Sequence, residues 1–425
     1  MSTHESNLSP QDAASAKRPT PRIMIFLMVI AFLNTIGIGI FLPVLAYIVQ
    51  AYVRDQNNLA IAVGWLASVY AICQFIAAPG LGALSDRFGR RPILLICMFG
   101  SAIGYALFGF GGALWVLFLG RIIDGVTGGN FSILSAYIAD ITEPEERGKY
   151  FGMFGAVAGA GFIVGPAIGG FMSQFGDSVP AYLAAGVTLI SLIWGYFFLP
   201  ESLSPEHRAT RISLAELNLF KQLGSAFAIP QLRWLLAATF FFSLPFAILQ
   251  SNMSVLIIDS LGWKADTIGY LFLLIGVLDI LMQGVLAARL LPIFGEIKLT
   301  VAGLVCEVIA YLLLGAVAIM PAPIFVFAGI SMFAIGTGFL EPASRGLISQ
   351  AAGPRQQGLV QGGSQSIQSL AMVVGPLLGG VLYTQIGHVV PFWFGAGVVG
   401  LAIIATLLAV PAIRAHRALA EAAGA

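Results

Sequence analysis

The sequence predicts an all-α integral membrane protein in which twelve transmembrane helices form two parallel-repeat halves of six helices each. Three observations favour this fold class. Of the 425 residues, 58% are hydrophobic and only 10% are charged, against roughly 25% charged residues in soluble domains. Apolar stretches of about 18 residues or more recur along the chain, and each can cross a hydrocarbon core of ~30 Å as a helix. Finally, a segment of the first half recurs in the second half.

Helices are expected because lipid cannot satisfy an open backbone, and the spans lack the alternation of a membrane β-barrel. The first six-helix half, residues 23–199, is expected to hold spans at 23–50, 59–82, 92–112, 114–138, 150–174 and 180–199. The second half, residues 232–412, is expected to hold spans at 232–259, 266–290, 298–320, 322–348, 358–386 and 389–411. The remaining segments are a disordered N-terminal tail, a central loop and a C-terminal tail, at 1–22, 200–231 and 413–425.

The distribution of lysine and arginine predicts the orientation of the chain. With the N-terminus inside, only Arg54 and Lys264 of the 21 basic residues fall on the outer side, and Arg121 falls within the fourth span. The rest fall in or next to cytoplasmic segments, as the positive-inside rule requires. We therefore expect a multi-pass protein of the cell inner (plasma) membrane with both termini and the central loop in the cytoplasm.

An internal repeat connects the two halves. "VGPAIGGFMSQFG" (164–176) recurs as "VGPLLGGVLYTQIG" (374–387), with one residue inserted in the second copy, and "RGKYFG" (147–152) aligns with "QGLVQG" (357–362). The repeat places the fifth span on the eleventh in the same direction through the membrane. Parallel repeats of this kind are typical of secondary transporters that bind substrate near the midplane, between the halves.

Four motifs, in order and at the expected spans, resemble those of the major facilitator superfamily. They are "GALSDRFGRRP" (82–92), "GRIIDG" (120–125), "GAGFIVGPAIGG" (159–170) and "LPESL" (199–203). The third resembles the motif of the antiporters, and "LPESL" is similar to the twelve-span drug:proton antiporter branch. "IGIGIFLPVL" and "ALWVLFLGR" resemble the tetracycline efflux proteins in particular. The resemblance implies alternating access, a small-molecule substrate and coupling to protons.

The first motif predicts a gate at the cytoplasmic face. Asp86 and Arg90 are four residues apart and can meet if the segment is helical. The resemblance implies further that Asp86 faces the N-terminus of the eleventh helix and that Arg90 pairs with Asp140, so that the two halves are held together there. Alternatively, these arginines only satisfy the positive-inside rule.

The third motif predicts a tightly packed and bendable fifth span. Small residues allow helices to approach closely, and a proline removes a backbone hydrogen bond and can kink a helix. We expect a hinge at Gly155, Gly159, Gly165, Pro166, Gly169 and Gly170.

Charged side chains within the spans are candidates for proton coupling, because each costs several kcal/mol in lipid unless it is paired or hydrated. Arg121 and Asp124 are three residues apart in span four, and Glu341 has Arg345 four residues away in span ten. Such pairs also fit a structural role. Asp279 and Glu307 lie near the middle of spans eight and nine with no apparent partner on their own helix, which favours proton or substrate handling. The expected proton-coupling set is Arg121, Asp124, Asp279, Glu307 and Glu341.

Polar side chains within the spans are candidates for the substrate cavity, although such residues also form hydrogen bonds between helices. They are Asn34, Gln74, Asn130, Gln250, Asn252, Gln283, Gln365 and Gln368. One departure from the family pattern bears on the substrate. Tetracycline efflux proteins usually carry an aspartate in the first span just before the "GIG" stretch, where this chain has Asn34. A neutral side chain cannot exchange protons, so tetracycline itself is left open as the substrate.

These observations predict a proton-coupled antiporter that exports a hydrophobic or amphipathic small molecule by alternating access. A sugar or metabolite carrier of the same fold is the alternative. A membrane enzyme is disfavoured because no histidine lies within a span, and a nucleotide-driven pump is disfavoured because no GxxxxGK[ST] loop occurs. We expect a monomer in contact with lipid and protons, with no cofactor, no metal and no nucleic-acid partner.

Overall fold

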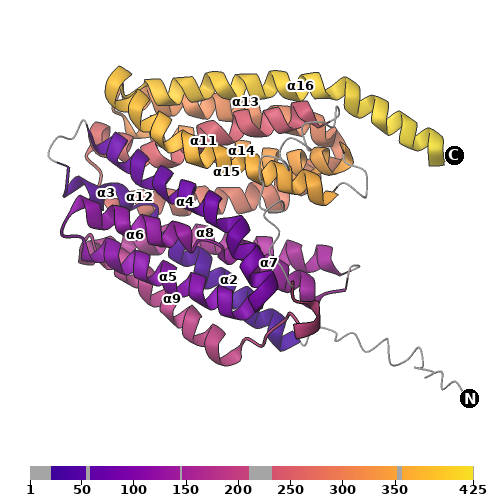
Figure 1. The fold of residues 1–425 in the computed structure, drawn as a ribbon. Coiled ribbons are helices and arrows are strands. Elements are labelled where there is room, and N and C mark those ends of the chain that lie inside the picture. The colour runs from indigo at the N-terminus through magenta and orange to yellow at the C-terminus, as the bar shows by residue number, and fades with distance from the viewer. Residues whose placement is uncertain (1–20, 54–57, 144–145, 210–231, 352–356, 425) are drawn as a thin grey trace, which may run out of the picture.

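The computed structural model describes residues 21–53, 58–143, 146–209, 232–351 and 357–424, and within these ranges every regular element is a helix. Figure 1 shows two bundles of long helices side by side, one from each half of the chain. The first bundle contains α2 (Pro21–Phe41), α3 (Leu45–Gln50), α4 (Leu59–Phe88), α5 (Arg90–Phe110), α6 (Leu114–Val126), α7 (Asn130–Ile141), α8 (Arg147–Met172), η2 (Ser173–Phe175) and α9 (Val179–Phe198). A short helix, η3 (Pro205–His207), follows it.

The second bundle is also entirely helical where it is described. It contains α11 (Arg233–Leu261), α12 (Ala265–Leu281), the π-helix η4 (Met282–Ala287), α13 (Ala288–Val317), α14 (Pro323–Ala351), α15 (Gln357–Val381), the π-helix η6 (Leu382–Ile386) and α16 (Val390–Gly424). Most of the expected N-terminal tail and most of the central loop lie outside the described residues, and the last two residues of the expected tail already belong to α2. The expected C-terminal tail continues α16 as a helix to Gly424.

Among the described residues, ten helical segments are long and apolar enough to cross a membrane, a number that is consistent with twelve spans for two reasons. The expected fourth span is divided between α6 and α7, each too short to cross alone. The expected eighth and ninth spans join into one helical stretch, Ala265–Val317. Within that stretch the backbone turns at Gly295, whose φ of 77° lies in the left-handed region that favours glycine.

The break in the fourth span comes at "TGG", residues 127–129. The amide N–H of Gly128 bonds to Gly125 O, so the regular helical ladder is lost there. Gln74 of α4 donates from Nε2 to the freed carbonyl of Gly128 at 2.9 Å. The side chain of a neighbouring helix therefore satisfies a backbone group that lipid could not.

The repeat is confirmed in three dimensions. In the first copy Gly165 and Gly169 pack against the backbone of α2, and in the second copy Gly375 and Gly379 pack against α11. The inserted residue of the second copy falls in η6, where a wider π-helical turn accommodates one extra residue. Beyond it the two copies are again equivalent, since Gly176 and Gly387 both end their segments at positive φ.

The two halves meet at the end of the bundle that carries the α3–α4, α8–α9, α11–α12 and α15–α16 connections, which we call the closed end. There Gly170 lies against Gly269, and Gly64 against Pro376. Two hydrogen bonds also join the halves, from Tyr47 Oη to Trp263 O (2.5 Å) and from Leu377 N to Ser68 Oγ (3.2 Å). We call the opposite end, which carries the start of α2 and the end of α16 in Figure 1, the terminal end.

Candidate functional site

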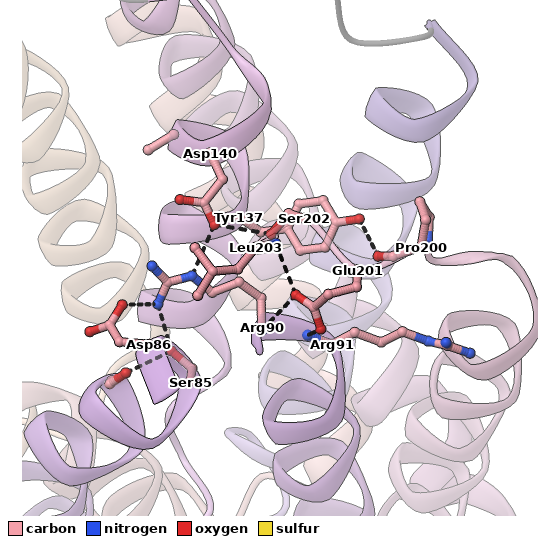
Figure 2. Close-up of polar contacts among 12 residues, drawn as sticks. Ser85, Asp86, Arg90, Arg91, Tyr137, Asp140, Pro200, Glu201, Ser202 and Leu203 are labelled. Atoms are coloured by element: carbon pink, nitrogen blue, oxygen red, sulfur yellow. Dashed lines mark hydrogen bonds and ion pairs between the residues drawn. The ribbon is translucent and has the colours of Figure 1, made fainter. Parts of the chain in front are cut away.

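A cluster of charged residues lies at the terminal end of the first half (Figure 2). The side chain of Arg90, at the start of α5, is 9% exposed, and its guanidinium lies between two carboxylates. It contacts Asp86 Oδ1 at 2.5 Å and Asp140 Oδ2 at 3.0 Å, and it donates to Ser85 Oγ at 2.7 Å. Asp86 and Arg90 thus meet across the turn at Gly89, and Arg90 connects α4, α5 and α7.

Asp86 has a more open environment than Arg90. Its side chain is 49% exposed and is bound to its own half of the molecule through Arg90. The expected contact with the N-terminus of the eleventh helix concerns the start of α15, where residues 352–356 and the side chains that follow them lie outside the described residues. The expected clasp between the halves therefore involves a segment outside the described residues.

Sequence reasoning missed two further members of this cluster, Glu201 and Ser202. Glu201 accepts the backbone N–H of Arg90 at 2.8 Å and of Arg91 at 3.2 Å. These are the first amides of α5, whose own N-cap residue Gly89 supplies no side-chain acceptor. A carboxylate at this position satisfies orphan donors and complements the helix dipole. Gly89 is required there, since its φ is 105° and a Cβ would lie 2.4 Å from Glu201 Oε2.

Ser202 completes the cluster by donating to Asp140 Oδ2 at 3.0 Å, the oxygen that also accepts from Arg90. Further along, the N–H of Ala209 bonds to Asp86 O at 2.9 Å. The segment after span six is therefore fixed to the gate. We refer to Asp86, Arg90, Asp140, Glu201 and Ser202 together as the gate cluster.

Replacing Glu201 by alanine is expected to lower the free energy of unfolding by about 1–2 kcal/mol, because two partly buried helix amides lose their acceptor. Glu201→Gln keeps one acceptor oxygen and should cost less. Thermal unfolding of the purified protein measures the effect, and Glu206→Gln, at an exposed position of η3, is the matched control. Equal melting temperatures for Glu201→Ala and the control would contradict the capping role.

The antiporter-motif glycines divide into two groups along α8. A Cβ on Gly165 or Gly169 would lie within 2.8 Å of backbone atoms of α2, and one on Gly170 would lie 2.4 Å from Gly269 of the other half. Gly155 and Gly159, nearer the terminal end, have no neighbour within 4 Å of such a Cβ. Gly161 of the same motif also packs against α2, where a Cβ would lie 2.8 Å from Phe32 O, so the close packing runs from the middle of α8 to the closed end. The helix α8 continues through Pro166 without a break.

The buried acid of the first half is paired. Asp124, on α6, is 3% exposed and contacts Arg121 Nη1 at 3.1 Å. The guanidinium also lies over the ring of Tyr70 at 4.0 Å, a cation–π geometry. A neutralised ion pair stacked on an aromatic ring fits a structural position as well as a coupling one.

Three of the expected cavity residues gather beside this pair. Asn34, Gln74 and Asn130 line one pocket together with Asp124, at the break between α6 and α7. Asn130 is 5% exposed, and its Oδ1 has no hydrogen-bond partner in the described part of the chain. The first half thus contains a small polar pocket of its own.

Two expected coupling acids of the second half have partners. Asp279 accepts hydrogen bonds from Gln283 at 2.8 Å and from Thr337 at 3.2 Å. The expectation that Asp279 has no partner on its own helix was therefore wrong, because Gln283 lies one turn further along. Glu341 contacts Arg345 at 2.7 Å, and both side chains are partly or largely exposed.

Glu307 has no such partner. Its side chain is 0% exposed, and neither carboxylate oxygen has a hydrogen-bond partner among the described residues. It lies where α13 crosses α14, with its Cγ 2.8 Å from the position of a Cβ on Gly336. The crossing of Gly303 with Gly336 repeats that of Gly104 with Gly120, which lies beside Asp124.

The other expected cavity residues do not share one pocket in this conformation. Gln368 lines a second pocket with Glu341 and Arg345. Asn252 is completely buried, donates to Ile248 O, and packs against Gly379, so it takes a structural position in the α11–α15 contact. Gln250 is half-buried and Gln365 exposed, and neither lines these pockets.

Two parallel six-helix halves that close at one end, with charged residues buried inside each half, define a polytopic membrane protein of the secondary transporter class. The comparisons with known families agree. Residues 27–312, and again residues 235–424, match the family model described as Major Facilitator Superfamily. The chain belongs to this superfamily.

Curated relatives match along almost the whole chain. The class E tetracycline resistance protein of Escherichia coli is 33% identical over 390 residues, which is 91% of this chain and 94% of that protein. Multidrug resistance protein 2 of Bacillus subtilis (strain 168) is 28% identical, over 90% of this chain and 94% of its own length. The human organic anion transporter MFSD10 has the same fold, with a TM-score of 0.70 at 24% identity, over 91% of this chain and 99% of that one.

Proposed function

We propose that this protein is a proton-coupled antiporter that exports a hydrophobic or amphipathic small molecule by alternating access. The relatives named for tetracycline and multidrug resistance support this substrate class over a sugar or another polar metabolite. In the proposed topology the terminal end faces the cytoplasm and the closed end faces outward, across the inner membrane. The conformation described above then receives substrate from the cytoplasm. We further propose that the protein acts as a monomer surrounded by lipid.

Glu307 is the proposed proton carrier. Removing a lone carboxylate from water costs several kcal/mol, so an unpaired, fully buried one is expected to be held as the neutral acid. Asp124 and Glu341 are neutralised by Arg121 and Arg345, and Asp279 has two hydrogen-bond donors. The observation that carries the coupling proposal is the complete burial of Glu307 with no hydrogen-bond partner in the described part of the chain.

The gate cluster is proposed to act as a latch rather than as the substrate site. Arg90 holds Asp86 and Asp140 together in the first half. In the outward-facing state, the exposed carboxylate of Asp86 would meet the positive N-terminus of α15, which favours an anion. The latch would then close the cytoplasmic end while protons enter from outside.

Asp86→Asn is expected to reduce the transport rate about 10-fold while leaving substrate affinity within about two-fold. The ion pair with Arg90 is proposed to be present in both states, whereas the contact with the N-terminus of α15, about 1 kcal/mol or more, belongs to the outward-facing state alone. Initial uptake rates and equilibrium binding of the same substrate, measured on the same preparation, separate the two effects. Loss of binding in a folded Asp86→Asn protein would contradict the latch.

Transport in proteoliposomes tests the proposed function. Vesicles in which the terminal end faces outward should accumulate tetracycline or ethidium when the interior is acidic, and a protonophore should abolish the accumulation. Failure of every such compound to accumulate, together with pH-dependent uptake of a sugar, would favour the alternative carrier.

A further inference from the structure

Three buried polar side chains lie along one face of α13, outside the polar contacts described so far. Thr300, Glu307 and Tyr311 are seven and four residues apart, a spacing that places them on the same side of a helix. Each is at most 3% exposed. In each, a side-chain oxygen has no hydrogen-bond partner among the described residues. We call these three residues the α13 row.

Unpartnered polar atoms at this depth are costly, at about 1–3 kcal/mol each, and folded proteins contain only a few. The α13 row places a hydroxyl on either side of the carboxyl group along the helix. Thr239 and Thr406, which are also buried nearby, bond instead to the carbonyls of their own helices at 2.9 and 2.8 Å. Among the described hydroxyls of this half, that of Thr384 in η6 also lacks a partner, so what distinguishes the α13 row is that three such side chains share one face of one helix.

Thr300 is the member of the α13 row that lies nearest the terminal end of the bundle. Thr300 lines the pocket formed by α11, α13, α14, α15 and α16, and this pocket also contains Glu341 and Arg345. Leu304 and Leu340 line the same pocket, and Leu304 lies one turn before Glu307 on α13. Both members of the Glu341–Arg345 pair are partly or largely exposed, so the pocket is in contact with the surroundings on that side.

At the other end of the row, Tyr311 is covered. Its ring packs edge-on against Phe333, with 6.4 Å between centroids, and a Cβ on Gly395 of α16 would lie 3.1 Å from it. Tyr311 is 1% exposed. In this conformation the α13 row is therefore covered by side chains at Tyr311, on the side of the closed end. At Thr300, on the side of the terminal end, it adjoins the pocket.

The charged and titratable groups around Glu307 are few. On α14 they are Glu341 and Arg345, which neutralise each other at 2.7 Å. Cys306 and Tyr311 are on α13 itself, and Asp279 of α12, which packs on α14, is held by Gln283 and Thr337. The described side chains of α16 and the middle of α11 carry no charge. No cation in the described part of the chain is placed to keep Glu307 ionised.

We propose that Thr300 and Tyr311, with bound water, conduct protons to and from Glu307, and that the pocket beside Glu341 and Arg345 is the cytoplasmic mouth of this path. The three side chains are separated by about 10 Å and 6 Å along the helix axis, too far for direct hydrogen bonds. Water that bonds to otherwise unsatisfied polar groups bridges such gaps in protein interiors. This inference rests on the proposed proton coupling and adds the route by which protons reach and leave Glu307.

The proton balance is simple. In the outward-facing state a proton passes along water and the Tyr311 hydroxyl to the Glu307 carboxylate, which becomes the neutral acid. In the inward-facing state the acid returns its proton to water at Thr300, and the proton leaves through the pocket. Each hydroxyl donates one proton and accepts another, so neither is ionised at the end of the step. Thr300 and Tyr311 are positioning residues in this scheme.

The test compares pH-driven transport with exchange that needs no net proton movement. Thr300→Val and Tyr311→Phe each remove one hydroxyl, and Thr239→Val removes a hydroxyl of the same pocket that is already bonded to its own helix. In proteoliposomes, the first two should slow uptake of tetracycline or ethidium driven by a pH gradient by about 10-fold or more. Counterflow of the same compound at equal pH should stay within two-fold of wild type, as should both rates for Thr239→Val.

Each outcome decides a different question. Absence of pH-driven uptake by the wild-type protein would overturn the proposed function. Wild-type coupling that persists unchanged in Thr300→Val and Tyr311→Phe would overturn the path alone, as would equal slowing of uptake and counterflow. Thr300→Ser and Thr300→Ala give a second pair, both smaller than threonine. Serine should retain the pH-driven rate and alanine should lose it, and equal rates for the two would overturn the role of the Thr300 hydroxyl.

Discussion

Glu307→Gln is expected to abolish pH-driven transport while the protein remains folded and binds substrate. Glutamine has nearly the same volume as glutamic acid, so it can occupy the space between α13 and α14 without a new cavity, but it cannot release a proton. Loss of the proton-transfer step is expected to lower the pH-driven rate by at least about 100-fold. Uptake into proteoliposomes and equilibrium binding measure the two quantities separately.

The thermal stability of Glu307→Gln provides an independent check. Because no partner of the carboxyl group is lost, the melting temperature should be equal to or higher than that of wild type. Glu143→Gln, at an exposed position beyond α7, is the control for both measurements. Full pH-driven uptake by Glu307→Gln would show that another acid carries the proton.

Gly64→Ala is expected to shift the protein away from the conformation described above. The added Cβ would lie 2.4 Å from the carbonyl oxygen of Pro376 in the other half, a backbone atom that cannot move without separating the halves. Overpacking of this kind costs about 1–3 kcal/mol. A cost of about 1 kcal/mol lowers about five-fold the ratio of molecules whose halves are in contact at the closed end to molecules whose halves are separated there. Distances between spin labels at Ser178 and Lys264, in a background without the three native cysteines, measure the ratio.

The same helix supplies the control for this experiment. A Cβ on Gly80 would have no neighbour within 4 Å, so Gly80→Ala should leave the distance distribution unchanged. An unchanged distribution in Gly64→Ala would mean that the contact between Gly64 and Pro376 does not hold the closed end together.

The fold followed from the sequence because its determinants are local or repeated. The length of each apolar stretch is set by the thickness of a bilayer, and the recurrence of "VGP" and "GG" places α8 and α15 in equivalent contacts. Two departures also left signals. The "TGGN" segment (127–130) marks the break between α6 and α7, and the residue inserted in the second copy of the repeat marks η6.

The site was harder to predict because the environment of a side chain depends on neighbouring helices. Asp279 and Glu307 are both single acids within apolar spans, so the sequence does not distinguish them. In the structure, Thr337 of α14 donates a hydrogen bond to Asp279, whereas the neighbour of Glu307 on α14 is Gly336, which has no side chain to donate. Glu201 stabilises a helix that begins 111 residues earlier in the chain, a contact without a local pattern. The role proposed for Asp86 involves a second conformation, and a sequence pattern does not separate the contacts of two conformations.

Proton release on substrate binding tests the central claim most directly. When tetracycline or ethidium, whichever compound the vesicles accumulate, is added to the purified protein in weakly buffered solution near neutral pH, wild type should release about one proton for each molecule bound. Glu307→Gln should bind the compound and release none. Equal release by both proteins, or binding to wild type without release, would contradict an exchange of substrate for a proton at Glu307.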